Sequence, residues 1–254
     1  MKFSRAIVRI PCRSLVKGLT TQKLGKPDYA KAFEQHTAYV EVLKASGLEV
    51  VVLDPDEAYP DSVFVEDTAL LTPECAIITN PGALSRRGET ERIEVTVREF
   101  YENVERIEPP GTLDGGDVLM VGSHYYIGLS TRTNPHGAWQ LINYLKDYGL
   151  SGSTIALRNL LHLKSGAAYL ENNTIVLAGE LRDRPEFGFL DAIIVADDES
   201  YAANCVWVNG RVMIAGGFPE TGRTIESYGY DTVFLDMSEF RKLDGGLSCL
   251  SLRF

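Results

Sequence analysis

Five short runs rich in β-branched and other apolar residues recur along the chain, and each leads into acidic or turn-forming residues. Runs of this length and composition, bounded by turn-forming residues, are typical of β-strands. They cover residues 48–54, 104–108, 153–157, 192–197 and 232–236. Their recurrence predicts a fold built from one repeated unit.

A second kind of segment follows each run within about 5 to 15 residues and predicts a β-hairpin. The paired stretches are 67–71 with 76–78, 117–121 with 125–127, 168–170 with 175–177, and 205–208 with 212–214. Turns such as Asn209-Gly210 suit hairpin loops because Asn and Gly tolerate positive φ. The fifth stretch, a strand predicted over 248–252, runs out of chain. We expect residues 6–10 to supply its partner from the amino terminus.

Helical patterns follow most of the hairpins. The clearest one starts after Asn134, a favoured N-cap residue, has Pro135 in its first turn and is closed by Gly149. Similar but weaker patterns cover residues 27–46, 89–101 and 220–228. The unit is therefore a hairpin, a helix and a strand, repeated about five times at intervals of roughly 40 to 50 residues.

Units of this kind cannot bury their apolar faces alone and must pack around a common centre. No low-complexity linker divides the chain. We therefore expect one α/β domain over residues 1–254. Its fold would be a closed five-bladed α/β propeller, with the last blade completed by the amino-terminal strand. An open α/β sheet is the alternative.

The repeat predicts where polar residues gather. One position, between a strand of the repeat and the following hairpin, holds most of the residues suited to chemistry. These residues are Asp61, Glu66, Asp67, Asp114, Asp117, His162, Asn204, Asp244 and Cys249. Equivalent positions of a pseudo-symmetric ring lie near its axis on one face. Residues far apart along the chain should therefore converge there.

Composition narrows the possible partners. The net charge of −10 argues against nucleic acid and anionic membranes, which both favour Lys/Arg patches. No stretch approaches the roughly 18 apolar residues of a spanning helix, and the first twenty residues lack the apolar region of a signal peptide. The four cysteines show no C-x-x-C spacing. We expect free thiols in a reducing cytoplasm.

Cys249 and His162 are the candidate nucleophile and proton shuttle. A lone cysteine in an apolar strand is usually a small buried hydrophobe, which is our interpretation of Cys205 and Cys75. Beside Cys249, however, the pair Gly245-Gly246 admits close approach of a ligand. His162 could equally be a core histidine, but it occupies the repeat position equivalent to Cys249.

The remaining candidates are charged. Asp114 could be an ordinary turn residue, because Asp-Gly usually is. The adjacent Glu66 and Asp67 open an apolar strand, which would be costly without a cationic partner. Arg86 could be solvated, whereas Arg132 precedes a helix start, where a cation is unfavourable unless an anion binds. Carboxylates suit a guanidinium and arginines suit an α-carboxylate, so this inventory complements arginine or a close relative.

These residues resemble one family, the dimethylarginine dimethylaminohydrolases, which have the five-bladed α/β propeller called the pentein fold. The resemblance extends over essentially the whole chain. It is carried by residues 26–29, 61–67, 85–89, 111–117, 132–134, 162–165 and 244–249.

The resemblance implies a role for each matching residue. Cys249 would be the nucleophile and His162 the proton shuttle, with Asp114 orienting and charging the imidazole. Asp67, with Glu66, would hold the guanidinium. The α-amino and carboxylate groups would bind to Asp61, Arg86, Arg132 and the backbone around Leu19, Leu243 and Asp244.

The implied reaction is hydrolysis of asymmetric dimethylarginine or monomethylarginine to citrulline and an alkylamine, without cofactor or metal, in a monomer or homodimer. Two alternatives remain. One is another guanidine hydrolase on the same fold, such as an arginine deiminase, and the other is a non-catalytic propeller that binds a partner. No lysine stands near Cys249 in its motif and the nearby carboxylates raise a thiol pKa. We therefore expect the bound cationic guanidinium to lower that pKa.

Overall fold

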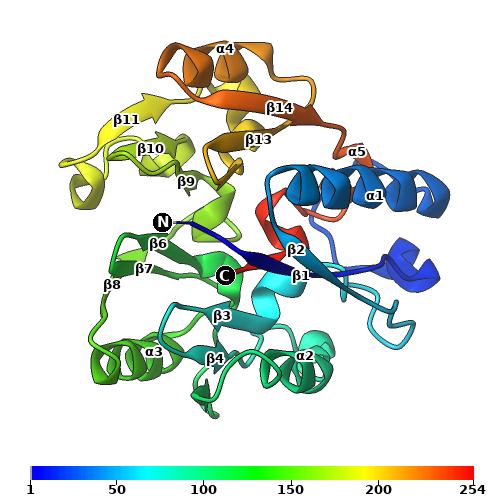
Figure 1. The fold of residues 1–254 in the computed structure, drawn as a ribbon, viewed down its shortest axis with the longest axis vertical. Coiled ribbons are helices and arrows are strands. Elements are labelled where there is room, and N and C mark those ends of the chain that lie inside the picture. Colours follow the sequence, from blue (N-terminus) through cyan, green and yellow to red (C-terminus); the bar gives the residue numbers. More distant parts are fainter. Residues whose placement is uncertain (1) are drawn as a thin grey trace.

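The computed structural model describes residues 2–254 as five three-stranded sheets arranged around a common centre (Figure 1). In every sheet the middle strand pairs antiparallel with one neighbour and parallel with the other. The sheets are β15–β1–β2 (Leu252–Arg253, Arg5–Arg9, Glu49–Leu53), β3–β4–β5 (Ala69–Leu71, Ala76–Ile78, Val104–Arg106), β6–β7–β8 (Val118–Val121, His124–Leu129, Ser151–Ala156), β9–β10–β11 (Ala167–Tyr169, Thr174–Leu177, Asp191–Ile194) and β12–β13–β14 (Val206–Val208, Arg211–Ala215, Asp231–Leu235). The predicted repeat of hairpin, helix and strand is confirmed in four of the five sheets.

Helices connect the second and third strands of four blades. They are α1 (Tyr29–Ala45), α2 (Glu89–Val97), α3 (Pro135–Asp147) and α4 (Pro219–Ser227), and Figure 1 shows them on the outside of the ring. The Asn134 side chain caps α3 by accepting from Gly137 N at 2.8 Å, and Gly149 follows the helix at a φ of 74°, as predicted. The fourth blade instead uses two 3-10 turns, and a short helix, α5 (Ser238–Arg241), was not predicted.

The two ends of the chain meet in one sheet. Residues Ala6 and Ile7 of β1 lie opposite Arg253 and Leu252 of β15, and the carbonyl oxygen of Phe254 accepts from Ser4 N and Arg5 N, each at 2.8 Å. The prediction that the amino-terminal strand completes the last blade is therefore confirmed.

The prediction of a strand over residues 248–252 was largely wrong. Ser248–Leu250 form a 3-10 turn, η9, and only Leu252–Arg253 pair as a strand. The reason is that Ser248 forms hydrogen bonds to distant side chains. Its N–H donates to the Asn204 side chain at 2.9 Å, and its hydroxyl donates to Glu66 at 2.7 Å. These bonds direct the backbone of Ser248 away from a β-ladder.

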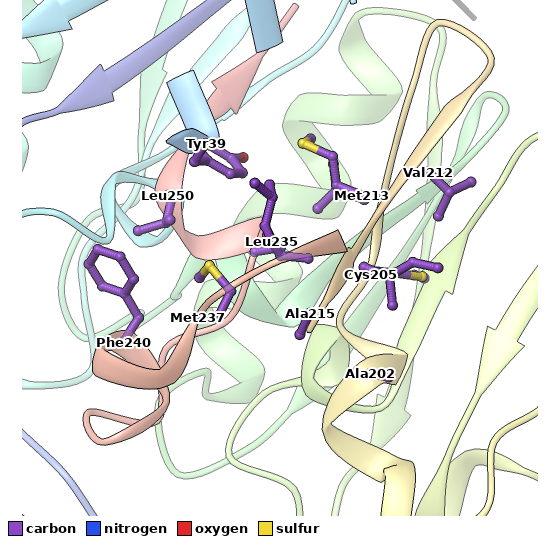
Figure 2. Close-up of a cluster of buried hydrophobic side chains, with 14 of the residues drawn as sticks. Tyr39, Ala202, Cys205, Val212, Met213, Ala215, Leu235, Met237, Phe240 and Leu250 are labelled. Atoms are coloured by element: carbon purple, nitrogen blue, oxygen red, sulfur yellow. The ribbon is translucent and has the colours of Figure 1, made fainter. Parts of the chain in front are cut away.

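The largest apolar cluster joins α1 to the fourth and fifth blades, and Figure 2 shows part of it around Tyr39, Leu235, Phe240 and Leu250. Tyr39 is fully buried, and its hydroxyl lies 2.6 Å from the Ser251 hydroxyl. Cys205 belongs to the same cluster at 3% exposure. Its interpretation as a small buried hydrophobe is consistent with this position.

One 3-10 turn precedes the first strand of each hairpin, so the five turns occupy equivalent places in the repeat. They are η2 (Val65–Thr68), η4 (Gly115–Asp117), η5 (Leu163–Ser165), η8 (Asp197–Ala203) and η9 (Ser248–Leu250). Neighbouring turns contact one another, as η2 does with η4 and η9. The polar positions predicted to converge lie on or next to these turns.

Gly115 is where two of the turns pack backbone against backbone. A Cβ atom on Gly115 would overlap the carbonyl oxygen of Glu66. We expect Gly115→Ala to lower the free energy of unfolding by about 3 kcal/mol, because the backbones of η2 and η4 would have to separate. Thermal or denaturant unfolding measures this loss.

Gly216→Ala is the matched control, because its Cβ would meet nothing closer than the Leu235 carbonyl oxygen at 3.5 Å. Its free energy of unfolding should change by no more than about 0.5 kcal/mol. Equal stability of the two variants would contradict the tight packing of the turns.

Candidate active site

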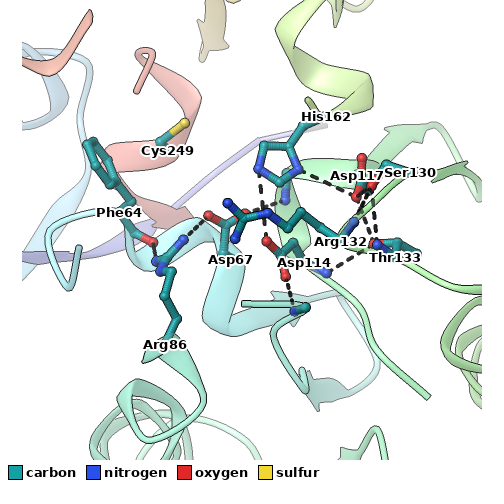
Figure 3. Close-up of polar contacts among 12 residues, drawn as sticks. Phe64, Asp67, Arg86, Asp114, Asp117, Ser130, Arg132, Thr133, His162 and Cys249 are labelled. Carbon is teal, nitrogen blue, oxygen red and sulfur yellow. Dashed lines mark hydrogen bonds and ion pairs between the residues drawn. The ribbon is translucent and has the colours of Figure 1, made fainter. Parts of the chain in front are cut away.

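Four of the turns bring Asp67, Asp114, His162 and Cys249 together at the centre of the ring (Figure 3). A cavity of about 170 Å³ opens at this point. Its lining includes nine of the predicted site residues, namely Leu19, Asp61, Asp67, Arg86, Arg132, His162, Leu243, Asp244 and Cys249. Glu66 lines an adjoining cavity, and Asp114 lies fully buried behind His162. The predicted convergence of residues far apart in sequence is therefore present in the fold.

Cys249 is the middle residue of turn η9 and is half-buried. The backbone N–H of Gly246 donates to its sulfur at 3.3 Å, which favours a thiolate. Burial, and then the carboxylates of Glu66 and Asp67, nevertheless raise the pKa of the Cys249 thiol to about 12. The thiol is therefore protonated at neutral pH in the absence of a ligand.

Lys164 lines the same cavity as Cys249, which the sequence around Cys249 does not show. Its ammonium opposes the rise in the pKa of the Cys249 thiol, although weakly, because it is paired with Glu66 Oε1 at 2.7 Å. The expectation of an acidic surrounding for Cys249 holds, but the fold adds a lysine from the fourth blade.

The His162 ring lies between two buried carboxylates. Its Nδ1 lies 3.4 Å from Asp117 Oδ2, and its Nε2 lies 3.9 Å from Asp114 Oδ2. Burial alone would lower the pKa of His162, but Asp117 first, then Asp67 and Asp114, raise it to about 9. His162 therefore carries its proton at neutral pH.

Asp117 was among the residues predicted to converge, but the sequence assigned it no role in the site. Its carboxylate accepts from Ser130 Oγ and Thr133 Oγ1, each at 2.7 Å, and from Leu163 N at 3.0 Å. These three donors fix the carboxylate against the ring of His162. Its place in the motif Asp114-Gly-Gly-Asp117 was the available signal, and only the fold shows that Asp117 lies nearer the ring than Asp114.

Asp114, the predicted orienting acid, is completely buried. Its Oδ1 accepts from Gly82 N at 2.8 Å, whereas its Oδ2 has no hydrogen-bond partner among residues 2–254. Burial, and then the neighbouring Asp67, raise the pKa of Asp114 to about 6. The free oxygen is the one that faces His162 Nε2.

Arg86 is buried in a cluster of acceptors. It reaches Asp67 Oδ2 at 2.5 Å, Glu89 Oε2 at 2.8 Å and the Phe64 carbonyl at 2.9 Å (Figure 3). Burial would raise the pKa of Asp67, but Arg86, followed by His162, lowers it to about 2. Arg132 forms no side-chain hydrogen bond or ion pair within the described part of the chain. Of the two predicted carboxylate-binding arginines, Arg132 is the one with free donors.

Glu66 links three turns. Its carboxylate accepts from Lys164 Nζ on η5 and from Ser248 Oγ on η9, both at 2.7 Å, and it is 3% exposed. The family resemblance implies that Glu66, together with Asp67, holds a guanidinium. The fold gives both of its carboxylate oxygens protein partners before any ligand binds.

Two carboxylates beside the cavity hold residues 18–22 in place through hydrogen bonds. Asp61 Oδ1 accepts from Leu19 N at 2.9 Å, and Asp244 accepts from Thr21 N and Gln22 Nε2, each at 2.6 Å. Asp244 precedes η9 and has a φ of 59°. This left-handed backbone conformation directs its side chain toward residues 18–22. The predicted contacts at Leu19, Asp61 and Asp244 thus form one wall of the cavity.

Glu180 holds the loop that leads to His162, and no sequence signal pointed to it. Its carboxylate accepts from Arg158 N at 3.1 Å, Asn159 N at 2.9 Å and Leu160 N at 3.0 Å. These bonds lower the pKa of Glu180, although burial opposes them. The loop is therefore held two residues before the imidazole.

Asp67, Asp114 and His162 could also hold a cation. Each offers one ligand atom, and these atoms lie within 4.8 Å of one another. Carboxylate and imidazole are common metal ligands. The absence of a metal requirement stays a prediction from the sequence.

Comparison with known proteins places this site in a family. A family model described as "N,N dimethylarginine dimethylhydrolase, eukaryotic" matches residues 20–181. The N(G),N(G)-dimethylarginine dimethylaminohydrolase of Pseudomonas aeruginosa is 56% identical over 253 residues, covering 99% of this chain and 100% of the relative. The chain belongs to the dimethylarginine dimethylaminohydrolase family. The Streptomyces coelicolor enzyme of the same name is 37% identical over 100% of this chain and 98% of its own length.

Solved structures agree with the fold. A P. aeruginosa dimethylarginine dimethylaminohydrolase, a cysteine-to-serine variant complexed with citrulline, matches with a TM-score of 0.99 at 55% identity over all of both chains. The N-terminal domain of the cyanobacterial arginine dihydrolase ArgZ matches with a TM-score of 0.89 at 18% identity, over 100% of this chain and 97% of that one. The second likeness shows a shared fold alone.

The charge on His162 should depend more on Asp117 than on Asp114. Asp117→Asn removes the nearer negative charge, so the imidazolium becomes less stable and the pKa of His162 falls from about 9 toward its ordinary value. Asp114→Asn should lower it less. NMR titration of the imidazole measures both, with His124 as the internal reference; its ring nitrogens lie 2.8 Å from the Ser151 and Ser153 hydroxyls and its ring packs against Tyr126. A larger fall in the Asp114 variant would contradict this order.

Proposed function

We propose that this chain hydrolyses Nω,Nω-dimethyl-L-arginine and Nω-monomethyl-L-arginine to L-citrulline, releasing dimethylamine or methylamine. The observation that carries the proposal is the pairing, in one cavity, of the Cys249 thiol with a charged His162 and with binding groups of both signs. The relative at 56% identity bears the name of this activity, and a related structure holds citrulline, the proposed product.

The binding groups suit the two ends of an arginine. The free donors of Arg132 suit the α-carboxylate, and the carboxylate of Asp61, together with backbone near Leu19 and Leu243, suits the α-ammonium. The low pKa of Asp67, about 2 beside Arg86, leaves its carboxylate ionised at neutral pH, where it supplies a negative charge for the guanidinium. Arg86 acts through Asp67, because its own donors are taken up within the fold.

The first half of the reaction forms a covalent intermediate. The cationic guanidinium lowers the pKa of the Cys249 thiol, which releases its proton to solvent, and the resulting thiolate bonds to the guanidinium carbon and gives a tetrahedral adduct. His162 then gives its proton to the departing nitrogen, the carbon–nitrogen bond breaks, and a thiouronium remains on Cys249. A pKa of about 9 ensures that His162 holds this proton at neutral pH.

The second half returns the enzyme to its starting state. His162, now neutral, takes a proton from water, and the hydroxide adds to the thiouronium carbon. The carbon–sulfur bond breaks, the hydroxyl of the adduct loses its proton to solvent, and citrulline leaves. Cys249 departs as the thiolate and takes up a proton from solvent once the cationic ligand has gone. One imidazole thus serves as acid and then as base, and the carboxylates of Asp117 and Asp114 stabilise its charged form.

We also propose that the chain acts without a cofactor in the cytoplasm as a monomer or homodimer. All four cysteines are free thiols, which suits a reducing compartment. No helix within residues 2–254 is long and apolar enough to cross a membrane. The arginine deiminase alternative differs only in the substrate, and the non-catalytic alternative predicts no turnover at all.

Replacing Cys249 by serine should lower citrulline formation from dimethylarginine by at least about 10³-fold, because a hydroxyl is a far weaker nucleophile at this pH. Cys205→Ala is the control, since Cys205 is a buried core residue and its variant should keep its activity. A colorimetric citrulline assay measures both. Full activity in the serine variant would overturn the mechanism, and arginine used as well as the methylarginines would overturn the substrate.

Binding of a cationic ligand should make the Cys249 thiolate appear at lower pH. In the free protein the pKa is about 12, and a guanidinium beside the sulfur stabilises the negative charge and lowers it. Ultraviolet absorbance of the thiolate against pH, with and without a non-reacting amidine analogue, measures the shift, and Cys249→Ala identifies the signal. An unchanged titration would contradict the role of the ligand.

A further inference from the structure

Two cavities meet at Cys249 and His162. The smaller measures about 170 Å³ and is lined by Asp61 and Arg132. The larger measures about 450 Å³ and shares Cys249 and His162 but neither of those two binding residues. The reacting atoms therefore lie at the junction of two spaces.

The orientation of the substrate follows from this arrangement and rests on the proposed function. The α-amino and carboxylate groups belong in the smaller cavity, because the groups that suit them line it. With its carbon at the Cys249 sulfur, the guanidinium then directs its terminal nitrogens toward the larger cavity. His162 lines both spaces, so its proton can reach a nitrogen at the junction.

We propose that the larger cavity receives the substituent of the departing nitrogen. The chain would then act on Nω-alkylarginines with substituents well beyond methyl, the preferred class being linear alkyl groups that end in a neutral hydroxyl. The substrate class is therefore defined by the amine that leaves, not by methylation as such.

The volume supports this class. A substituent of about four non-hydrogen atoms needs roughly 120 Å³, taking about 30 Å³ for each, the share of a water molecule in the liquid. The larger cavity has several times the volume that two methyl groups need. Its lining includes the small residues Gly116, Ser165 and Gly246, of which Gly246 lies next to the sulfur.

The chemistry of the walls favours an apolar stem with a polar end. Leu160 and Leu161 line the cavity together with His162, so an alkyl stem contacts carbon. Farther along, Arg241 stacks over Tyr201 at 4.8 Å and makes no ion pair within the described part of the chain. Its donors are free for a hydroxyl oxygen.

Tyr201 joins this wall to the nucleophile. Its hydroxyl donates to the Gly245 carbonyl at 2.7 Å, and the next residue, Gly246, donates to the Cys249 sulfur. Asp244 lines the same cavity, so an anionic end group would meet a carboxylate as well as Arg241. A neutral hydroxyl avoids that repulsion.

The reaction balances as it does for methylarginine. The sulfur–carbon bond forms, the carbon–nitrogen bond breaks with the proton of His162, and the hydroxyalkylamine departs. Water adds its oxygen to the thiouronium carbon and restores the proton to His162, and the carbon–sulfur bond then breaks and releases citrulline and the Cys249 thiolate. No further reactant is needed.

The test compares Nω-monomethyl-, Nω-propyl-, Nω-(3-hydroxypropyl)- and Nω-(2-carboxyethyl)-L-arginine, with citrulline and the released amine both measured. We expect kcat/KM for the hydroxypropyl compound to lie within about tenfold of that for the monomethyl compound, and the carboxyethyl compound to be at least about tenfold slower than the hydroxypropyl one.

Ser200→Trp narrows the larger cavity at an exposed rim position. It should lower kcat/KM for the hydroxypropyl compound by at least about tenfold and leave the monomethyl value within about threefold.

Asp198→Trp is the matched control, because Asp198 is exposed on the same turn but does not line the cavity. It should leave both substrates unaffected. A wild-type kcat/KM more than about 100-fold lower for the propyl and hydroxypropyl compounds than for monomethylarginine would overturn the proposal. Equal effects of the two tryptophan variants would also overturn it. Failure of every compound, monomethylarginine included, would instead reject the proposed function.

Discussion

The structure depends on neutralising the carboxylates that the ring brings together at its centre. Glu66 is held by Lys164 and Ser248, and Asp67 by Arg86, each from a different segment of the chain. A buried carboxylate without such partners would be costly, so the turns can approach only if these bonds form. The packing of Gly115 against the Glu66 carbonyl requires the same close approach.

Burial and the charges around the turns set the protonation states of the site. Arg86, followed by His162, lowers the pKa of Asp67 to about 2, and Asp117, followed by Asp67 and Asp114, raises that of His162 to about 9. Burial, and then Glu66 and Asp67, raise the pKa of the Cys249 thiol to about 12. The resting site therefore holds an acid ready to donate and a nucleophile that is not yet ionised. Under the proposed function, a cationic substrate completes the charge balance, which would couple recognition of the guanidinium to activation of the thiol.

Much of the fold was predictable because it depends on local patterns. Apolar runs rich in β-branched residues located the hairpins, one of them with the turn Asn209-Gly210, and Asn134 with Pro135 located the start of α3. The prediction was wrong for residues 248–252, where hydrogen bonds of Ser248 to distant side chains replace a β-ladder. No pattern within a short window of sequence contains such partners.

The sequence by itself determined the five repeats and, through the equivalent positions, which polar residues would meet. Residue type and the family resemblance then indicated the chemistry of Cys249 and His162. Only the tertiary structure decided which carboxylate lies nearest the imidazole, which arginine keeps free donors, and how much space lies beyond the sulfur. The physical reason is separation along the chain: the partners of Glu66 are 98 and 182 residues away. Distances between such residues are set by the packing of whole blades, which local periodicity does not encode.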